Sequence, residues 1–203
     1  MKFQLTKDCY EKNEVIFNSD EVDLEPGLTV LVGCNGYGKS TWMKQIKNQL
    51  KPNKQYLTFD YATSDTSYNK MDKFLVNGDL TKMATMATSS EGERLFIGFA
   101  DFVQQFRRFI EKNKNRKDLF IFADGIDSGL SIDKLEYLKE FFHIVLDDNP
   151  DVNLYIIVST NSYELAKDER CLDVVNNDIK TFKTYKEFRN FVIESSKTVN
   201  GRY

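Results

Sequence analysis

The residues with the most specific chemistry form a glycine-rich stretch, GCNGYGKST, at positions 33–41. Its spacing is G-x-x-x-x-G-K-[ST], with the fixed positions at Gly33, Gly38, Lys39 and Ser40. Glycines permit positive φ and let backbone amides approach phosphate oxygens closely. A lysine there neutralises the β- and γ-phosphates of a nucleotide, and a serine hydroxyl suits Mg²⁺, which prefers oxygen ligands. The stretch therefore predicts a nucleotide phosphate loop made of Gly33, Cys34, Asn35, Gly36, Tyr37, Gly38, Lys39, Ser40 and Thr41.

A second candidate is Asp124, which directly follows the apolar run LFIFA at 119–123. A buried strand that ends in a carboxylate can hold Mg²⁺ beside a nucleotide, directly or through water. The same acid can instead cap the loop that follows its strand. Because the phosphate loop lies upstream, we interpret Asp124 as a metal ligand, so Ser40 and Asp124 are the expected Mg²⁺ ligands.

These residues require a fold that brings the ends of several strands together. Short apolar runs predict strands at 14–17, 28–32, 56–59, 119–123 and 154–158. Helical spacing and capping signals predict helices at 42–50, from Glu93, after Ser131 and after Thr184, which forms a capping box with Glu187. Strands that alternate with helices indicate an α/β fold with a mainly parallel sheet, in one domain over residues 1–203.

Three further short motifs follow the phosphate loop along the chain. Residues 89–94 read SSEGER, residues 128–131 read SGLS and residues 157–161 read IVSTN. With the phosphate loop, which has the form G-x-N-G-x-G-K-S-T, they resemble the ABC-type ATPases, including the SMC and RecF branches. In that family these motifs are the signature before a helix, the loop at the dimer interface and the strand that ends in a switch histidine. The resemblance covers residues 14–165.

The resemblance implies a P-loop NTPase fold, with a mainly parallel sheet flanked by helices, a small antiparallel pair of N-terminal strands and a small helical insertion. It also implies that ATP and Mg²⁺ lie between two copies, so that a homodimer forms on ATP binding. The residues implied in contacts between copies are Ser90, Glu91, Gly92 and Glu93 of the signature and Ser128 and Gly129 of the dimer loop. Ser90 and Glu93 also fit an ordinary capping box. No long heptad segment separates Lys39 from Ser90, so the coiled-coil arm of SMC-type proteins is absent.

Three positions depart from the family's pattern. Gly125 stands where the family has a glutamate that orients the attacking water, and Asn161 stands where it has a histidine that senses the γ-phosphate. No glutamine follows the strand at 56–59, although Asp60 lies there. Asp127 can supply the missing carboxylate, or it can simply fix its loop. We therefore expect a weak ATPase, with Asp127 and Asn161 as the candidate catalytic residues.

Three functions are compatible with these residues. The first is a cytoplasmic ATP-dependent dimer switch that hydrolyses ATP slowly, in DNA repair, recombination or defence in a phage or bacterium. The second is a non-hydrolysing, nucleotide-gated binding module, which the substituted positions Gly125 and Asn161 favour. The third is the ATPase subunit of a transporter. The missing glutamine and histidine count against it, because transporters use both residues for coupling.

Composition and charge limit the setting. The 203 residues carry a net charge of −3, so no overall basic field requires a nucleic acid. The basic stretch at 107–117 can contact nucleic acid or can be a solvated helix end, and a nucleic acid or protein partner is left open. We expect no membrane segment, since no apolar run reaches the ~18 to 20 residues of a span. The three cysteines lack metal spacing and no signal peptide is recognisable, which predicts a cytoplasmic protein.

Overall fold

The computed structural model describes residues 1–6, 16–50, 56–60, 103–128 and 130–200. In these ranges the strands are β1 (Lys2–Gln4), β2 (Glu21–Asp23), β3 (Gly27–Val32), β4 (Tyr56–Asp60), β5 (Asp118–Asp124), β6 (Asn153–Ser159), β7 (Cys171–Asp173) and β8 (Asp178–Lys180). The helices are α1 (Lys39–Leu50), α6 (Ile132–Asp147), α7 (Tyr163–Ala166) and α8 (Tyr185–Asn200), and residues 103–112 are also helical. The expected helical insertion and the start of the helix from Glu93 lie outside the described residues.

The main sheet of the described chain has the strand order β4-β5-β6-β3-β7-β8. Its strands from β4 to β7 are parallel to their neighbours, and β8 pairs antiparallel with β7. A separate antiparallel pair is formed by β1 and β2. The expected α/β architecture with a mainly parallel sheet and a small N-terminal pair is confirmed. Because the parallel strands all end at one edge, the loops after β3, β5 and β6 leave from that same edge.

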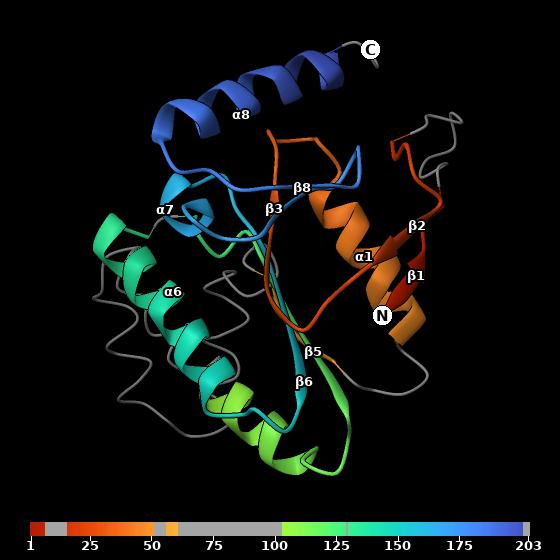
Figure 1. Cartoon of the computed structure of the whole chain (residues 1–203), viewed down its shortest axis with the longest axis vertical. Coiled ribbons are helices and arrows are strands. Elements are labelled where there is room, and N and C mark those ends of the chain that lie inside the picture. Colours follow the sequence, from red (N-terminus) through yellow and green to blue (C-terminus); the bar gives the residue numbers. More distant parts are fainter. Residues whose placement is uncertain (7–15, 51–55, 61–102, 129, 201–203) are drawn as a thin grey trace, which may run out of the picture.

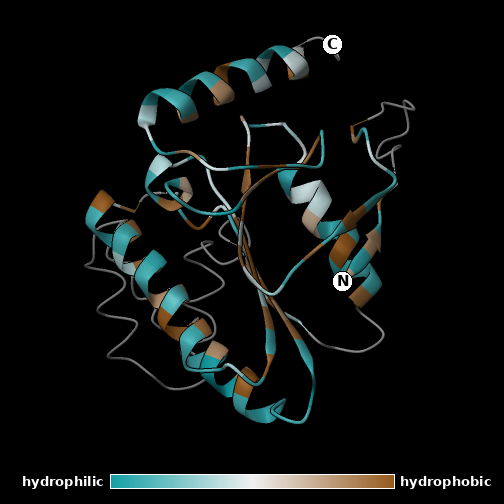
Figure 2. Ribbon diagram, viewed as in Figure 1, coloured by the Kyte–Doolittle hydropathy of each residue, from teal (hydrophilic) through white to brown (hydrophobic). Residues whose placement is uncertain are grey.

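Alternate side chains of the central strands enter two hydrophobic cores. Ile121 and Ala123 of β5 belong to the core under α6, whereas Phe120 and Phe122 belong to the core under α1. Successive side chains of a strand point to opposite faces, so both faces of the sheet are covered. A strand buried on both faces is a continuous apolar run, coloured brown in Figure 2. For this reason the sequence pattern located β3, β4, β5 and β6 to within one residue at each end.

Helices cover both faces of the sheet and the edge formed by the carboxyl ends of its parallel strands. Trp42, Met43 and Ile46 of α1 are fully buried on one face, and the helix begins directly after the glycine-rich loop. On the other face α6 buries Leu135, Leu138, Phe142 and Val145. Figure 1 shows α1 and α6 on opposite sides of the sheet, and α8 lying across the edge at which β3 ends.

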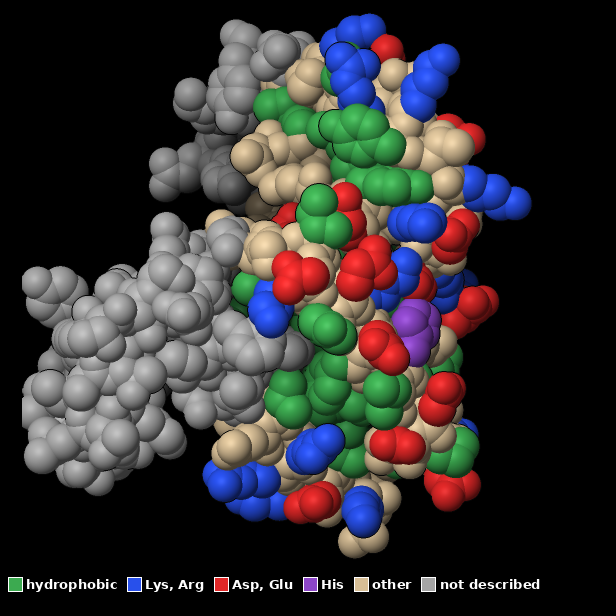
Figure 3. Space-filling view, turned by 90° about the vertical axis from the view of Figure 1, so that its left-hand side faces the viewer, with side chains coloured by type: hydrophobic (Ala, Val, Ile, Leu, Met, Phe, Trp, Pro, Cys, Tyr) green, Lys and Arg blue, Asp and Glu red, His purple; other side chains and the backbone are tan. Residues whose placement is uncertain are grey.

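The outer face of α6, seen in Figure 3, carries charged side chains. Its single histidine, His143, lies with Nε2 2.8 Å from Glu169 Oε1, and Lys139 Nζ lies 3.3 Å from the same oxygen. These contacts connect α6 to the segment that precedes β7. They give His143 a structural position away from the candidate site.

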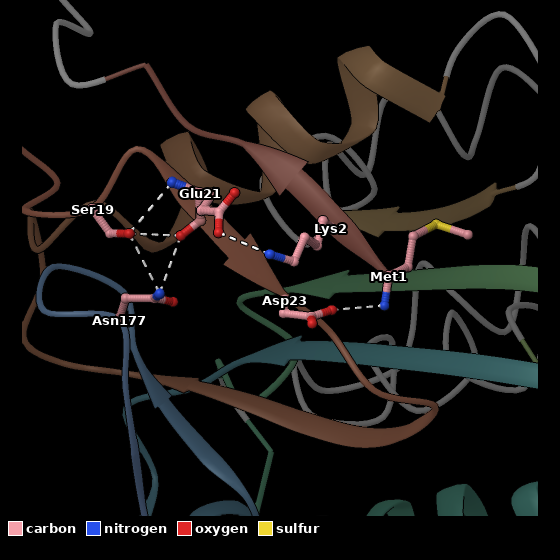
Figure 4. A network of polar contacts seen from close by, with 6 residues as sticks. All are labelled: Met1, Lys2, Ser19, Glu21, Asp23 and Asn177. Carbon is pink, nitrogen blue, oxygen red and sulfur yellow. Dashed lines mark hydrogen bonds and ion pairs between the residues drawn. The ribbon is translucent and has the colours of Figure 1, made fainter.

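A polar network holds the N-terminal strand pair (Figure 4). The Met1 amino group donates to Asp23 Oδ1 at 2.9 Å, and Lys2 Nζ donates to Glu21 Oε1 at 3.0 Å. Asn177, in the turn between β7 and β8, donates to the Glu21 carbonyl at 3.1 Å. The small pair is therefore connected to the edge of the main sheet that carries β8.

One local expectation was wrong, and a second was confirmed in position only. Residues 14–17 were expected to be a strand, but the described part, Ile16 and Phe17, is not in one, and the second strand is β2. Both side chains enter the same core, which the alternation of a strand does not allow. Ser131 precedes α6 as its N-cap, but its hydroxyl bonds to the Asp133 carboxylate and accepts no helix N–H. The hydroxyl proton is thus directed at the Asp133 carboxylate, in the first turn of the helix.

The capping box before α8 is confirmed. The Thr184 N–H donates to Glu187 Oε2 at 3.1 Å, and the Glu187 N–H donates to Thr184 Oγ1 at 3.3 Å. In the described parts of the chain, no helix combines the length and apolar character that crossing a membrane requires.

Candidate functional site

The loop at 33–38 connects β3 to α1 in a conformation that depends on two of its glycines. Gly33 has φ +133°, and a Cβ there would lie 2.1 Å from the Tyr37 ring. Gly38 has φ +110°, and a Cβ there would lie 2.8 Å from Ile16 Cγ2. Any larger residue at either position would displace these buried side chains. Both glycines are therefore needed to let the loop turn tightly onto the start of α1.

Tyr37 fixes the loop to the sheet. Its side chain is buried, and its hydroxyl donates to Asp173 Oδ1, at the end of β7, at 2.9 Å. Its ring also packs edge-on against Phe191 of α8, with 6.3 Å between centroids. Tyr37 was expected among the nucleotide-binding residues. Because its side chain points into the protein, any contact it makes with a ligand comes from its backbone.

Lys39 is buried where the loop meets α1. Its Nζ donates to the carbonyls of Gly33 at 2.6 Å and Cys34 at 3.1 Å, and to Asn161 Oδ1 at 2.9 Å. These three acceptors match the three N–H donors of an ammonium group. Burial lowers the pKa of Lys39 below its usual value, while the nearby Asp127, Cys34 and Asp124 act in the opposite direction.

Asn161 connects the three loops that leave the carboxyl edge of the sheet. Its side-chain Nδ2 donates to Asn35 Oδ1 at 2.9 Å, and its backbone N–H donates to Asp127 Oδ2 at 2.7 Å. Thr160 Oγ1 donates to the same Asp127 oxygen at 2.8 Å. The structure thus brings together Lys39, Asp127 and Asn161, which the sequence analysis had placed in one site. It also gives Asp127 a loop-fixing role through Oδ2.

Asp124 lies at the end of β5, as expected, and is held by Ser159. The Ser159 hydroxyl donates to Asp124 Oδ1 and accepts the N–H of Gly125 at 2.9 Å. Gly125 has φ +63°, so the residue after Asp124 occupies the left-handed region. In the sheet register Asp60, the last residue of β4, pairs with Asp124.

The donors expected for Mg²⁺ are Asp124 and the exposed Ser40 at the start of α1. No group of three or more His, Cys, Asp or Glu suited to hold a metal occurs in the described part of the chain. Mg²⁺ commonly uses one or two protein carboxylates and takes its other ligands from substrate phosphates and water. The donor set therefore fits a metal that arrives with a nucleotide.

The remaining expected residues fall into two groups. Ser128 is exposed in the turn after β5, where its N–H donates to the Gly125 carbonyl at 3.1 Å. Gly129 and the signature residues Ser90, Glu91, Gly92 and Glu93 lie outside the described residues.

Sequence reasoning missed one contact that the fold makes. The N–H of Cys34 donates to the hydroxyl of Ser195, on α8, at 2.8 Å. No local pattern marks Ser195, because only the fold brings α8 next to the loop. Neither a scan of protein-family models nor a search of curated proteins gives a match to this chain. The case for the site therefore depends on its motifs and its contacts.

Proposed function

We propose that this chain binds ATP with Mg²⁺ at residues 33–41 and hydrolyses it slowly, as a nucleotide-dependent dimer switch with the P-loop NTPase fold of the ABC type. The observation that carries the proposal is the meeting of Lys39, Asp127 and Asn161 beside a glycine loop at the carboxyl edge of a parallel sheet. Ligands of open α/β sheets bind at this edge. The setting in DNA repair, recombination or defence rests on the sequence resemblance alone.

The loop has the donors that a chain of phosphates requires. In the described part of the chain, the backbone N–H groups of Gly36, Gly38, Lys39 and Ser40 donate to no backbone carbonyl. The start of α1 adds the partial positive charge of a helix N-terminus. Lys39 supplies a full charge, and a phosphate can replace its present carbonyl and amide acceptors with stronger, charged ones.

The site has weaker means of positioning the attacking water. Gly125 has no side chain, and its positive φ makes a glutamate there cost about 1 to 2 kcal/mol. Asp127 already accepts two hydrogen bonds at Oδ2, but within the described residues none reaches its Oδ1. This second oxygen is the remaining candidate to orient water. A general base contributes typically about 10²- to 10⁴-fold, so a poorly placed one predicts slow turnover.

Asp127→Asn tests the catalytic step more sharply than Asp127→Ala. Since both loop contacts use one oxygen, an asparagine can keep them with its amide oxygen and lose only the free carboxylate oxygen. We expect ATP binding near the wild-type level. Phosphate release should be slower by a factor of up to about 10². Asp127→Ala, which also removes the loop contacts, is the comparison. Unchanged phosphate release in Asp127→Asn would refute a role for this carboxylate in hydrolysis.

The non-hydrolysing binding module is the second candidate. The observation that favours it is the commitment of Asp127 Oδ2 to Thr160 and Asn161, which is what a purely structural carboxylate would do. Phosphate release by the wild type separates the two functions. Release above the level of Lys39→Ala supports the ATPase, and release equal to that of Lys39→Ala, with ATP still bound by the wild type, supports the binding module.

Dimerisation is tested at Ser90, in the proposed signature. By the resemblance, one copy supplies only part of the contacts to the γ-phosphate, so ATP and Mg²⁺ should favour a dimer. Ser90→Arg should block closure by its bulk and leave ATP binding to the monomer intact. Light scattering with ATP and Mg²⁺ measures the mass. A wild type that stays monomeric at high concentration, or an undisturbed dimer of the variant, counts against the switch.

A further inference from the structure

Helix α8 lies against the phosphate loop at three positions. The Ser195 hydroxyl accepts the N–H of Cys34 at 2.8 Å, and the ring of Phe191 packs against Tyr37. Val199 Cγ1 lies 3.5 Å from the position that a Cβ on Gly36 would occupy. Figure 1 shows the helix crossing the edge of the sheet from which this loop leaves. Three successive turns of α8 thus lie against one short loop.

Ser195 is placed to make a directional contact. It is 2 % exposed, and its hydroxyl donates to the Val192 carbonyl of its own helix at 2.7 Å. Its single proton is therefore used within α8, which leaves the oxygen lone pairs for the loop. Losing the hydroxyl would leave the N–H of Cys34 without its protein acceptor.

The start of α8 is held independently of the loop. Phe188 is buried in the core under α6 and packs on Phe182, with 5.4 Å between ring centroids. The capping box of Thr184 and Glu187 fixes the first turn. The first turn of the helix is therefore fixed to the core, and its later turns pack against the loop.

We propose that α8 is a clamp that holds the phosphate loop in its nucleotide-binding conformation, and that Ser195 is the positioning residue of this clamp. The inference rests on the proposed ATP site. A loop with three glycines loses much conformational freedom on becoming ordered. Contacts that order it before the ligand arrives therefore increase affinity. Because such coupling is reciprocal, nucleotide in turn stabilises the docked α8.

The contacts are arranged to support binding rather than to block it. The α8 contacts fall on Cys34 and Tyr37, and Val199 lies beside Gly36, in the first part of the loop. Lys39 bonds to the loop carbonyls and to Asn161 and not to α8. Among the described residues, no backbone carbonyl accepts from the amides of Gly38, Lys39 and Ser40 at the start of α1, so they can bind a ligand.

Two neighbouring serines provide a matched test. Ser195 and Ser196 each donate to the carbonyl three residues earlier in α8, both at 2.7 Å. Ser195 also accepts the N–H of Cys34 in the loop, whereas the corresponding bond of Ser196 is exposed. Calorimetry with ATP and Mg²⁺ on the full chain should show affinity about fivefold weaker or more in Ser195→Ala, and unchanged in Ser196→Ala. Equal affinity in the two variants, or tighter binding by Ser195→Ala, would overturn the clamp.

Cysteine alkylation gives a readout that does not depend on nucleotide. Cys34 is partly exposed beside Ser195, whereas Cys171 is fully buried and burial raises its pKa to about 12. In Ser195→Ala, peptide mapping should find faster alkylation of Cys34, with Cys171 still unreactive, which shows that the variant is folded. Wild-type rates at Cys34 in that variant would also overturn the clamp.

The outcome for the wild type separates this inference from the function it rests on. If the wild type binds ATP and Lys39→Ala does not, the site stands, and an unaffected Ser195→Ala then removes the clamp alone. If the wild type binds no ATP, the proposed function fails and the coupling of α8 to nucleotide fails with it.

Discussion

At the scale of the residue, Lys39 is the most informative side chain in the site. Its ammonium group is buried against two carbonyls and the Asn161 amide, and that burial lowers its pKa. A phosphate stabilises the charged form of the lysine. The pKa of Lys39 should therefore be higher with nucleotide bound than without it. At a pH between these two pKa values, Lys39 takes up a proton when nucleotide binds.

This difference predicts how ATP affinity depends on pH. Affinity should be constant while Lys39 is charged in the free protein, and should fall as pH rises through its lowered pKa. Calorimetric titrations from neutral to alkaline pH measure the fall. In Lys39→Arg the fall should disappear, because arginine stays protonated across this range. The same slope in both proteins would contradict a role for the Lys39 charge.

How much of the site is visible in the sequence depends on the kind of residue. The spacing of Gly33, Gly38, Lys39 and Ser40 identifies a loop because each of these residues serves a local geometric or electrostatic need. The motifs also predict Asp127 and Asn161 as candidates, and these two residues meet in the structure. The contact of Ser195 could not be predicted from the sequence, because its partner Cys34 is distant in the chain. A serine inside a helix also belongs to no motif that would mark it as a site residue.

At the scale of the element, the phosphate loop connects β3 to α1 and contacts both β7 and α8. The buried Tyr37 hydroxyl donates to Asp173 Oδ1, and Asp173 also accepts the N–H groups of Val175 and Asn176. Asp173 is 1 % exposed, so its carboxylate depends on these donors. The Tyr37 contact therefore stabilises the sheet edge as well as the loop.

Tyr37→Phe tests this contact, because it keeps the ring over Gly33 and removes only the hydroxyl. Loss of a hydrogen bond to a buried carboxylate should lower the free energy of unfolding by about 1 to 3 kcal/mol. Chemical denaturation measures the change. Tyr137→Phe, on the exposed face of α6, is the matched control and should be neutral. A Tyr37 variant as stable as this control would show that the bond to Asp173 contributes nothing.

The elements themselves were unequally predictable. β3 to β6 and the buried faces of α1 and α6 follow from hydrophobic patterns, because each buries a long apolar surface. β1, β2, β7 and β8 have three residues each, too few for a periodic signal. They form because other strands pair with them: β1 pairs with β2, β7 with the distant β3, and β8 with the preceding β7. The strand at 14–17 was wrong for a related reason, since an apolar pair such as Ile16 and Phe17 can fill a core without pairing.

At the scale of the whole molecule, the parallel sheet collects the loops after β3, β5 and β6 at one edge, and α8 crosses that edge. The functional account needs this arrangement, because Gly33, Asp127 and Asn161 come from separate parts of the chain. Its central claim is that the assembled edge binds ATP with Mg²⁺ through Lys39.

Calorimetric titration with ATP and Mg²⁺ tests that claim most directly, on the wild type, Lys39→Ala and Lys44→Ala. Lys44 is an exposed lysine on the same helix, so its loss controls for a change in overall charge. The account predicts magnesium-dependent binding by the wild type and Lys44→Ala, and a loss of about 1.5 to 3 kcal/mol or more in Lys39→Ala. Equal ATP affinity in the wild type and Lys39→Ala, or no binding by the wild type, would contradict it.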